Sequence, residues 1–182
     1  MKHQTISMAF SHVGLHVFDL EKMADFYQRI LGLLVTDRGK LPGRELVFMS
    51  ADVNEHHQVV LATGRTGSLD DKVVNQISFR LKSLEDLQTV YRSLLADGEA
   101  TDFRAVNHGN AWTLYFRDPE KNRIELFVDS PWYVAQPRAD DLDLNLPVDE
   151  LYALTEKMCK ADPSYMTRAQ WQAGFRKRFT AQ

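Results

Sequence analysis

Hydrophobic and polar residues alternate in two matching stretches of the chain, residues 11–18 and 75–81. Alternation of this kind is typical of a β-strand with one buried face. The first stretch is followed by apolar residues at helical spacing from Leu20 to Leu31. Asp19 before them is a good N-cap, and Gly32 after them ends the helix. The pattern predicts a strand followed by a helix.

The second stretch leads into a helix built on the same plan. Ser83 and Asp86 have the spacing of a capping box, an apolar stripe runs from Leu84 to Leu95, and Gly98 ends the helix. We attribute the apolar stripes of both helices to core packing.

Three further short strands are predicted after each helix. They cover residues 34–36, 46–50 and 58–63 in the first half of the chain, and residues 103–106, 113–117 and 123–128 in the second half. Each half is therefore a βαβββ unit.

The two halves are copies of one unit, because one lies over the other at a nearly constant offset. At 64 residues (76 − 12) His12 falls on Gln76, and at 65 residues (125 − 60) Val60 falls on Glu125. We predict an α+β fold in which paired βαβββ modules form a cupped mixed sheet. The first module covers residues 1–66 and the second covers residues 72–135. Residues 64–72 form the polar linker between them.

A different pattern begins after Pro131. A proline-rich, acidic stretch precedes two predicted helices, residues 149–160 and 167–179, which Asp162-Pro163 separates. This C-terminal helical extension, residues 136–182, could cover the cup or form a dimer contact. The pattern fits both roles.

Charge and composition narrow the class of protein. Lysine and arginine number 22 against 25 aspartates and glutamates, a formal net charge of −3, so the basic excess typical of nucleic-acid binding is missing. No run of about 18 apolar residues occurs, and Met1-Lys2-His3-Gln4 leads into no apolar signal core. A single cysteine, Cys159, excludes an intrachain disulfide and reads as an inert, partly buried thiol. We expect a cytoplasmic protein without nucleic-acid or membrane partners.

Four equivalent positions of the repeat are expected to line one concave face, because side chains on a strand alternate between its faces. They are His12, Val60, Gln76 and Glu125. A histidine and a carboxylate can hold a divalent metal and leave a position open for water or substrate. Taken singly, His12 could be an ordinary strand histidine and Glu125 could face solvent. Their symmetric placement favours a metal site.

Residues 106–125 resemble a known signature. Val106-Asn107-His108 is followed after five residues by Leu114-Tyr115-Phe116-Arg117-Asp118-Pro119-Glu120-Lys121-Asn122-Arg123-Ile124-Glu125. This spacing of His, Tyr, Asp-Pro and Glu looks like the signature of extradiol dioxygenases. Over its first 135 residues the chain resembles the vicinal oxygen chelate superfamily to which they belong. Lys121 stands where that family usually has glycine, so we expect a different backbone conformation at this turn.

The likeness extends upstream. Residues 75–79 (Asn-Gln-Ile-Ser-Phe) resemble the family's His-His-Val-Ser-Phe strand, and residues 55–59 (Glu-His-His-Gln-Val) resemble the strand that bears a catalytic histidine. The resemblance implies three metal ligands, His12, Gln76 and Glu125, and three active-site residues around the substrate, His57, His108 and Tyr115.

Gln76 is the one departure among these six residues, because the family's iron is held by two histidines and one carboxylate. An amide oxygen is harder than an imidazole nitrogen, so metal binding should weaken. Some glyoxalase-like relatives use glutamine as a ligand, which keeps the site possible. We expect a divalent metal, with Fe(II) first and Mn, Zn or Ni as alternatives. The alternative is a site in which the Gln76 side chain turns away from the metal.

Other readings of the same residues stay open. Adjacent strand residues face opposite ways, so only one of His56 and His57 can enter the cup, and we favour His57. His108 could belong to a simple hairpin, and Tyr115 could be a core aromatic with its hydroxyl at the rim. Asp118-Pro119 fits a turn better than a catalytic acid. A final set fits an aromatic substrate pocket as well as ordinary packing: Trp112, Phe116 and Trp132.

If the resemblance extends to activity, the protein is a metal-dependent extradiol dioxygenase that opens a catechol-type diol with O2. His57 would be its acid or base, because a histidine pKa of about 6.5 permits both roles. One alternative is a glyoxalase-like lyase or isomerase, which Val60 disfavours because it replaces an additional glutamate ligand. The other is a metal-free small-molecule binding protein, which Gln76 favours. We expect a homodimer or a higher homo-oligomer.

Overall fold

The computed structural model describes residues 9–71 and 74–180, the last three by their backbone alone. The chain forms two compact units, Met1–Asp71 and Lys72–Gln182. The prediction that no leader is present rests on residues 1–4, which lie outside the described residues. Among the described residues, no helix is both long enough and apolar enough to cross a membrane.

The first unit is built on a four-stranded sheet with the order β1-β4-β3-β2. Its strands are β1 (Val13–Val17), β2 (Leu34–Leu41), β3 (Arg44–Ser50) and β4 (Val59–Thr63). β1 and β4 are parallel, with Val13 opposite Val59, whereas the other neighbours are antiparallel. Parallel neighbours need a crossover connection, which α1 (Leu20–Leu31) and the β2–β3 hairpin supply.

The ends of α1 lie where the sequence predicts them. The Asp19 side chain accepts a hydrogen bond from the backbone N–H of Lys22 at 3.0 Å. Gly32 takes the left-handed conformation, with φ 68°, that is typical of a helix C-cap. The buried residues between these caps are Leu20, Met23, Ala24, Phe26, Tyr27 and Ile30. Local capping chemistry therefore fixes both ends of the helix.

β2 is longer than the predicted residues 34–36. It continues to Leu41 as a hairpin with β3, in which Lys40 lies opposite Glu45. Their side chains form an exposed ion pair at 2.6 Å. Most of this strand is exposed, so no buried face marks its outer half in the sequence.

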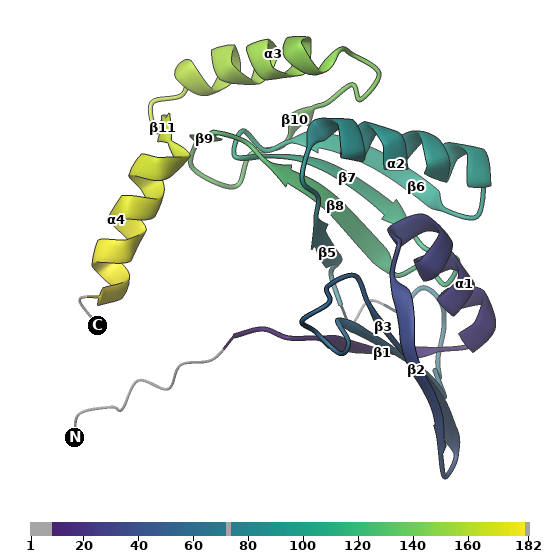
Figure 1. The fold of residues 1–182 in the computed structure, drawn as a ribbon. Coiled ribbons are helices and arrows are strands. Elements are labelled where there is room, and N and C mark those ends of the chain that lie inside the picture. The colour runs from purple at the N-terminus through teal and green to yellow at the C-terminus, as the bar shows by residue number, and fades with distance from the viewer. Residues whose placement is uncertain (1–8, 72–73, 181–182) are drawn as a thin grey trace. The chain divides into compact units, whose positions relative to one another are not determined.

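The second unit repeats the plan on a five-stranded sheet with the order β10-β6-β7-β8-β5. Its strands are β5 (Ile77–Arg80), β6 (Thr101–Asn107), β7 (Ala111–Arg117), β8 (Arg123–Asp129) and β10 (Asp140–Asp141). β5 and β8 are parallel, with Ile77 opposite Ile124, as β1 and β4 are in the first unit. α2 (Leu84–Asp97), capped by Ser83, runs along one face of this sheet (Figure 1). The α+β class and the βαβββ repeat are confirmed.

The C-terminal extension belongs to the second unit. It contains α3 (Val148–Lys160), β11 (Met166–Thr167) and α4 (Arg168–Thr180), and β11 pairs with β9 (Trp132–Tyr133), which comes just before the extension. Thr155 on α3 accepts hydrogen bonds from Trp112 Nε1 and Asn107 Nδ2, both at 2.8 Å. These bonds attach α3 to the sheet.

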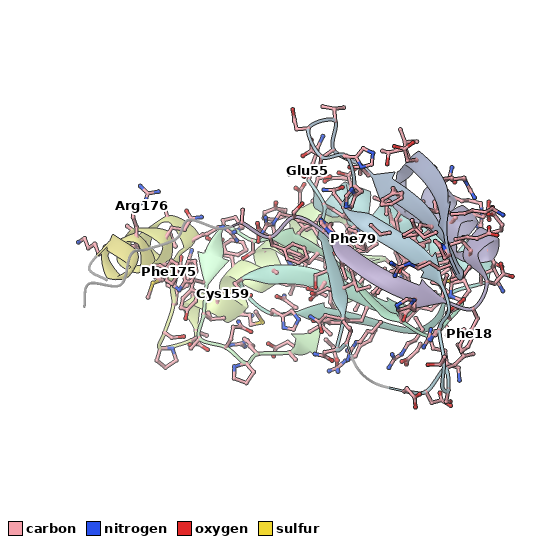
Figure 2. All side chains as sticks on the ribbon, turned by 90° about the horizontal axis from the view of Figure 1, so that it is seen from below. Phe18, Glu55, Phe79, Cys159, Phe175 and Arg176 are labelled. Carbon is pink, nitrogen blue, oxygen red and sulfur yellow. The ribbon has the colours of Figure 1, made fainter. Side chains whose placement is uncertain are left out.

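Cys159, labelled in Figure 2, lies on α3 and is fully buried. Its thiol donates a weak hydrogen bond to the carbonyl oxygen of Gly109 at 3.5 Å. Burial raises the pKa of this thiol. A buried, protonated thiol is a poor nucleophile, which agrees with the inert role predicted for it.

β7 and β8 separate two faces of the second unit's sheet. Every second residue of β7, from Trp112 to Phe116, is fully buried on the face that α2 and α3 cover. The side chains between them, Thr113 and Tyr115, point to the opposite face because strand residues alternate. Tyr115 lies opposite Glu125 in the register, so this second face carries the candidate site.

Candidate active site

Glu125 lies in the middle of β8 and is 9% exposed. Its Oε2 accepts hydrogen bonds from Gln76 Nε2, at 2.9 Å, and from the Ser78 hydroxyl. The parallel pairing of β5 with β8 sets Ser78 opposite Glu125 and Gln76 beside it. A carboxylate with so little exposure needs such partners. Gln76 and Glu125, two of the three predicted ligands, are therefore in direct contact.

Tyr115 and His108 form a second pair beside Glu125. The Tyr115 hydroxyl lies 3.1 Å from Nε2 of His108, and Nδ1 of His108 is bonded to the carbonyl oxygen of Arg138. A carbonyl oxygen only accepts, so Nδ1 carries the proton. In the neutral ring, Nε2 then accepts from the tyrosine hydroxyl. His108 is also the first residue of the turn between β6 and β7, which agrees with the alternative that it belongs to a hairpin.

The Tyr115 phenol is held in its protonated form. Burial first, and then the neighbouring Glu125 carboxylate, raise its pKa well above the ordinary value. Arg123 opposes this shift, with its guanidinium carbon 4.4 Å from the centroid of the tyrosine ring. The phenol is therefore a hydrogen-bond donor at neutral pH.

Two predicted histidines meet in the first unit. His12, just before β1, and His57, on the loop between β3 and β4, have ring centroids 4.3 Å apart. Burial lowers the pKa of His57 below 6.5, and the nearby His12 and His56 lower it further. His57 is therefore neutral at pH 7 and able to accept a proton.

The prediction that His56 and His57 face opposite ways is wrong. Both lie outside the strands, on the loop from which Glu55 projects in Figure 2. Strand alternation does not apply there, and the two Nδ1 atoms lie 2.9 Å apart. Nε2 of His56 is also 2.8 Å from the Asp37 carboxylate. Asp37, His56 and His57 thus form one hydrogen-bonded chain.

The structure joins the six predicted site residues in three pairs: His12 with His57, Gln76 with Glu125, and His108 with Tyr115. The first pair belongs to the first unit and the other two to the second. Convergence of His12 with Gln76 and Glu125 stays a prediction. Neither unit, over its described residues, gathers three His, Cys, Asp or Glu side chains placed to hold a metal. A metal on Glu125 would therefore need another kind of ligand, and the adjacent Gln76 has an amide oxygen.

The expected change of backbone at Lys121 is not found. Lys121 has φ 62°, the left-handed conformation that glycine adopts easily. Oδ1 of Asp118 accepts hydrogen bonds from the backbone N–H groups of Glu120 and Asn122, at 3.0 and 2.8 Å. These bonds stabilise the turn with lysine in it, and Asp118 is a turn residue as predicted.

A pocket of about 360 Å³ opens on the Glu125 face of the second unit. The strands, including β9, and the β6–β7 hairpin supply His108, Asn110, Ala111, Thr113, Glu125, Phe127, Asp129, Trp132 and Tyr133, and the C-terminal extension supplies Gln136, Arg168 and Trp171. Of the three aromatic residues with two readings, Trp132 lines the pocket, whereas Trp112 and Phe116 are fully buried in the core. The extension therefore helps to enclose a pocket in its own unit.

Ser78, Arg168 and Trp171 are among the residues around this site that were not predicted. Ser78 could have been found, because it follows Gln76 by two residues on the same face of the chain. Arg168 and Trp171 belong to a segment without an equivalent in the repeat. No local pattern connects them with β8.

The fold and this site define a protein of two βαβββ modules with a candidate small-molecule site on the second module. Residues 9–126 match the Glyoxalase/Bleomycin resistance protein/Dioxygenase superfamily. The chain belongs to this superfamily, and the predicted resemblance is confirmed.

Curated relatives of the chain include dioxygenases. It is 30% identical over 131 residues to Biphenyl-2,3-diol 1,2-dioxygenase 2 of Rhodococcus globerulus. It is 28% identical over 135 residues to the Manganese-dependent 2,3-dihydroxybiphenyl 1,2-dioxygenase of Geobacillus genomosp. 3. The alignments cover 69% and 72% of this chain but 65% and 39% of the relatives. The chain thus spans less than two thirds of the length of either relative.

Solved structures share the fold. A glyoxylase/bleomycin resistance protein/dioxygenase domain from Frankia sp. EAN1pec matches with a TM-score of 0.59 and 23% identity, over 69% of this chain and 100% of that chain. The fosfomycin resistance protein FosX from Listeria monocytogenes, complexed with Mn(II) and sulfate, matches with a TM-score of 0.54 and 20% identity, over 69% and 95%. At these identities the likeness shows the fold alone.

Proposed function

We propose that this protein is a metal-dependent extradiol dioxygenase that cleaves a catechol-type aromatic diol with O2. One observation carries the proposal: four side chains gather beside the pocket of the second unit and are joined in pairs by hydrogen bonds. They are Gln76, His108, Tyr115 and Glu125. A carboxylate, a protonated phenol and an oriented imidazole suit the recognition of two adjacent hydroxyl groups. The dioxygenase relatives support the same reading.

We propose His12, Gln76 and Glu125 as the ligands of a divalent metal. Two oxygen ligands at right angles, each about 2.1 Å from an ion, lie about 3 Å apart. Gln76 Nε2 lies 2.9 Å from Glu125 Oε2, so a half-turn of the amide would place its oxygen at a suitable spacing. The donor set is then one imidazole, one amide oxygen and one carboxylate, which fits the residues present. When bound, the metal would supply Lewis-acid stabilisation of the deprotonated diol.

The identity of the metal is part of the proposal. Fe(II) is our first choice, with Mn(II) close behind because one relative is named as manganese-dependent. Replacing an imidazole by an amide oxygen makes the set harder, which narrows the preference for Fe(II) over Mn(II). Zn and Ni are less suited to this donor set.

The protein's own groups would orient the substrate and move a proton. Tyr115 would donate to one substrate oxygen, because its raised pKa keeps the phenol protonated. His108 would present Nε2 as an acceptor, because Nδ1–H is bonded to the carbonyl of Arg138. His57 would accept and return a proton, because its lowered pKa leaves the imidazole neutral at pH 7.

The activity is tested by reconstituting the full chain anaerobically with Fe(II) or with Mn(II). Catechol and 2,3-dihydroxybiphenyl are then added with O2. We expect a yellow ring-opened product and consumption of O2 in an amount equal to the diol. If neither appears in samples shown by elemental analysis to contain bound metal, the dioxygenase proposal is rejected.

Tyr115→Phe tests the substrate-binding role in the same assay. We expect kcat/KM to fall by about 10- to 100-fold, because a hydrogen bond to a charged group contributes about 1.5–3 kcal/mol. Metal content should not change. Tyr91→Phe is a matched control, because Tyr91 lies on α2 and packs against Phe103 outside the pocket. Equal activity of Tyr115→Phe and wild type would remove Tyr115 from the site.

A metal-free binding protein is the second candidate. One observation favours it: Gln76 donates its amide to Glu125, so the carboxylate is satisfied without a cation. Metal content of protein purified from its own host separates the two candidates, since a full complement of metal supports the dioxygenase. The glyoxalase-like alternative lacks such support, because Val60 has no donor atom at its position of the repeat.

A further inference from the structure

The pocket of the second unit extends well beyond Glu125. Glu125, Phe127 and Asp129 all line it and share one face of β8, because they are two residues apart. At about 3.3 Å per residue, the Cα atoms of Glu125 and Asp129 lie roughly 13 Å apart along the strand. A bare diol ring is shorter than this distance. The pocket therefore has room for a substituent on the ring.

The end of the pocket at Asp129 has an excess of positive charge. Asp129 is shared by Arg80, whose Nε lies 3.0 Å from Oδ2, and by Arg168, whose Nη1 lies 2.8 Å from Oδ1. One carboxylate thus serves two guanidinium groups. Arg168 uses a single nitrogen for this ion pair, and no other described residue accepts from its guanidinium. Donors remain available on a residue that lines the pocket.

The position of Arg168 adds to the positive potential at this end of the pocket. It is the first residue of α4, where the helix dipole contributes positive charge. Its backbone N–H donates to the carbonyl of Pro131 at 2.8 Å, which fixes the start of the helix beside β9. The guanidinium is therefore held at the pocket by the backbone as well as by Asp129.

The pocket also has an aromatic lining and one unsatisfied hydroxyl. Phe127, Trp132 and Trp171 supply the aromatic surface. Thr113 Oγ1 is fully buried and has no hydrogen-bond partner among the described residues. Buried hydroxyls nearly always have a partner, so a polar atom of a ligand in the pocket would satisfy this one.

We infer that the pocket binds an aromatic diol whose ring carries a carboxylate-bearing side chain, with the carboxylate on Arg168. A guanidinium presents its N–H groups in a fork that matches a carboxylate. The ring packs on the aromatic lining, and Thr113 bonds to a polar atom of the ligand. The diol half of this inference rests on the proposed function, whereas recognition of the carboxylate requires no metal.

The test compares two probes on the metal-free, full-length protein by isothermal titration calorimetry. Dihydrocaffeate is a catechol with a propionate side chain, and its primary amide has the same size without the charge. We expect the acid to bind at least about tenfold more tightly than the amide at low salt, because charge-assisted hydrogen bonds are the stronger ones. Added salt should reduce the difference. Equal affinities for the two probes, or no binding of either, would overturn the inference.

Two variants test whether Arg168 causes the preference for the acid over the amide. Arg168→Gln should weaken binding of the acid by about tenfold or more and leave the amide unchanged. Arg92→Gln is the matched control, because Arg92 is an exposed arginine on α2 outside the pocket lining, and it should change neither affinity. A preference for the acid that survives in Arg168→Gln contradicts the assignment.

Thr113→Val is a second variant, and it removes no side-chain hydrogen bond among the described residues. We expect it to weaken binding of both probes by about threefold or more, the effect of one neutral hydrogen bond. Unchanged affinities in both Thr113→Val and Arg168→Gln would reject the inference. These affinities are measured without metal, so a failure of the protein to open the ring would not change them. The dioxygenase proposal and the carboxylate proposal can therefore fail separately.

Discussion

Gln76 donates its side-chain amide to Glu125 at 2.9 Å, next to the parallel pairing of β5 with β8. The repeat relates Gln76 to His12 and Glu125 to Val60. His12 and Val60 cannot form the same bond, because valine has no polar side-chain atom. The second module therefore carries an amide–carboxylate pair where the first carries a histidine alone. We therefore expect the metal affinity of the proposed site to depend on Gln76.

Replacing Gln76 by His should tighten binding of Fe(II) or Zn(II), because imidazole is the softer ligand. The expected gain is about tenfold, a common size for changes around metal ligands. Competition with a chelating dye measures it. Gln28→His, on the exposed surface of α1, is the matched control and should have no effect. Equal affinities of Gln76→His and wild type would mean that position 76 does not ligate, which favours the metal-free candidate.

His57 should titrate below its ordinary pKa of 6.5 in the metal-free protein, because burial and the charges of His12 and His56 disfavour imidazolium. His12→Asn removes one of those charges, so the His57 pKa should rise. The lowered pKa also determines how the free energy of unfolding changes with pH. Below pH 6.5 the unfolded chain binds the proton more readily than the folded chain, so the free energy of unfolding falls as the pH drops.

NMR titration of the imidazole ring protons measures the His57 pKa directly. Thermal unfolding between pH 7 and pH 5 checks the stability effect, which should be smaller in His57→Gln than in wild type. A His57 midpoint at or above 6.5 would contradict the contacts that the loop makes with His12 and His56.

Most of the fold could be predicted because its signals are local. Asp19 and Gly32 mark both ends of α1 through capping chemistry that needs no distant partner. The repeat offset of 64 (77 − 13) reappears in the sheets, where Val13 and Ile77 occupy equivalent parallel pairings. The outer half of β2 was missed, because an exposed strand has no buried face to produce alternation.

The candidate site was predictable in part. Gln76 and Glu125 meet because β5 and β8 pair, and the repeat already implied that pairing. The arrangement of His56 and His57 could not be predicted from strand alternation, because side chains on a loop do not alternate regularly between two faces. Arg168 reaches the pocket through contacts of the extension with β9, which depend on tertiary packing rather than on any local pattern.

Gly109 should not tolerate a side chain. It has φ 78°, and an added Cβ would clash with Val134 and lie 3.3 Å from Cys159 Sγ. Gly109→Ala should lower the free energy of unfolding by about 2–4 kcal/mol, from overpacking together with left-handed strain. Gly39→Ala is the control, because an added Cβ there meets nothing within 4 Å. Urea denaturation measures both, and similar stabilities of the two variants would contradict the prediction.

Two buried threonines of the second unit should respond in opposite ways to valine. Thr155 accepts hydrogen bonds from Trp112 Nε1 and Asn107 Nδ2. Thr155→Val leaves both donors without this acceptor, and the expected loss is about 2–4 kcal/mol of unfolding free energy. Thr113 Oγ1 has no partner among the described residues, so Thr113→Val should keep the stability or raise it by about 1 kcal/mol.

Urea denaturation of the ligand-free protein makes this comparison with one substitution at two sites of similar burial. Thr155 holds α3 on one face of the sheet, whereas Thr113 faces the pocket on the other. A loss in Thr113→Val as large as that in Thr155→Val would show that the Thr113 hydroxyl already stabilises the free protein. In that event it would not be available to a ligand. The opposite signs are therefore expected only if the Thr113 hydroxyl has no partner until a ligand binds.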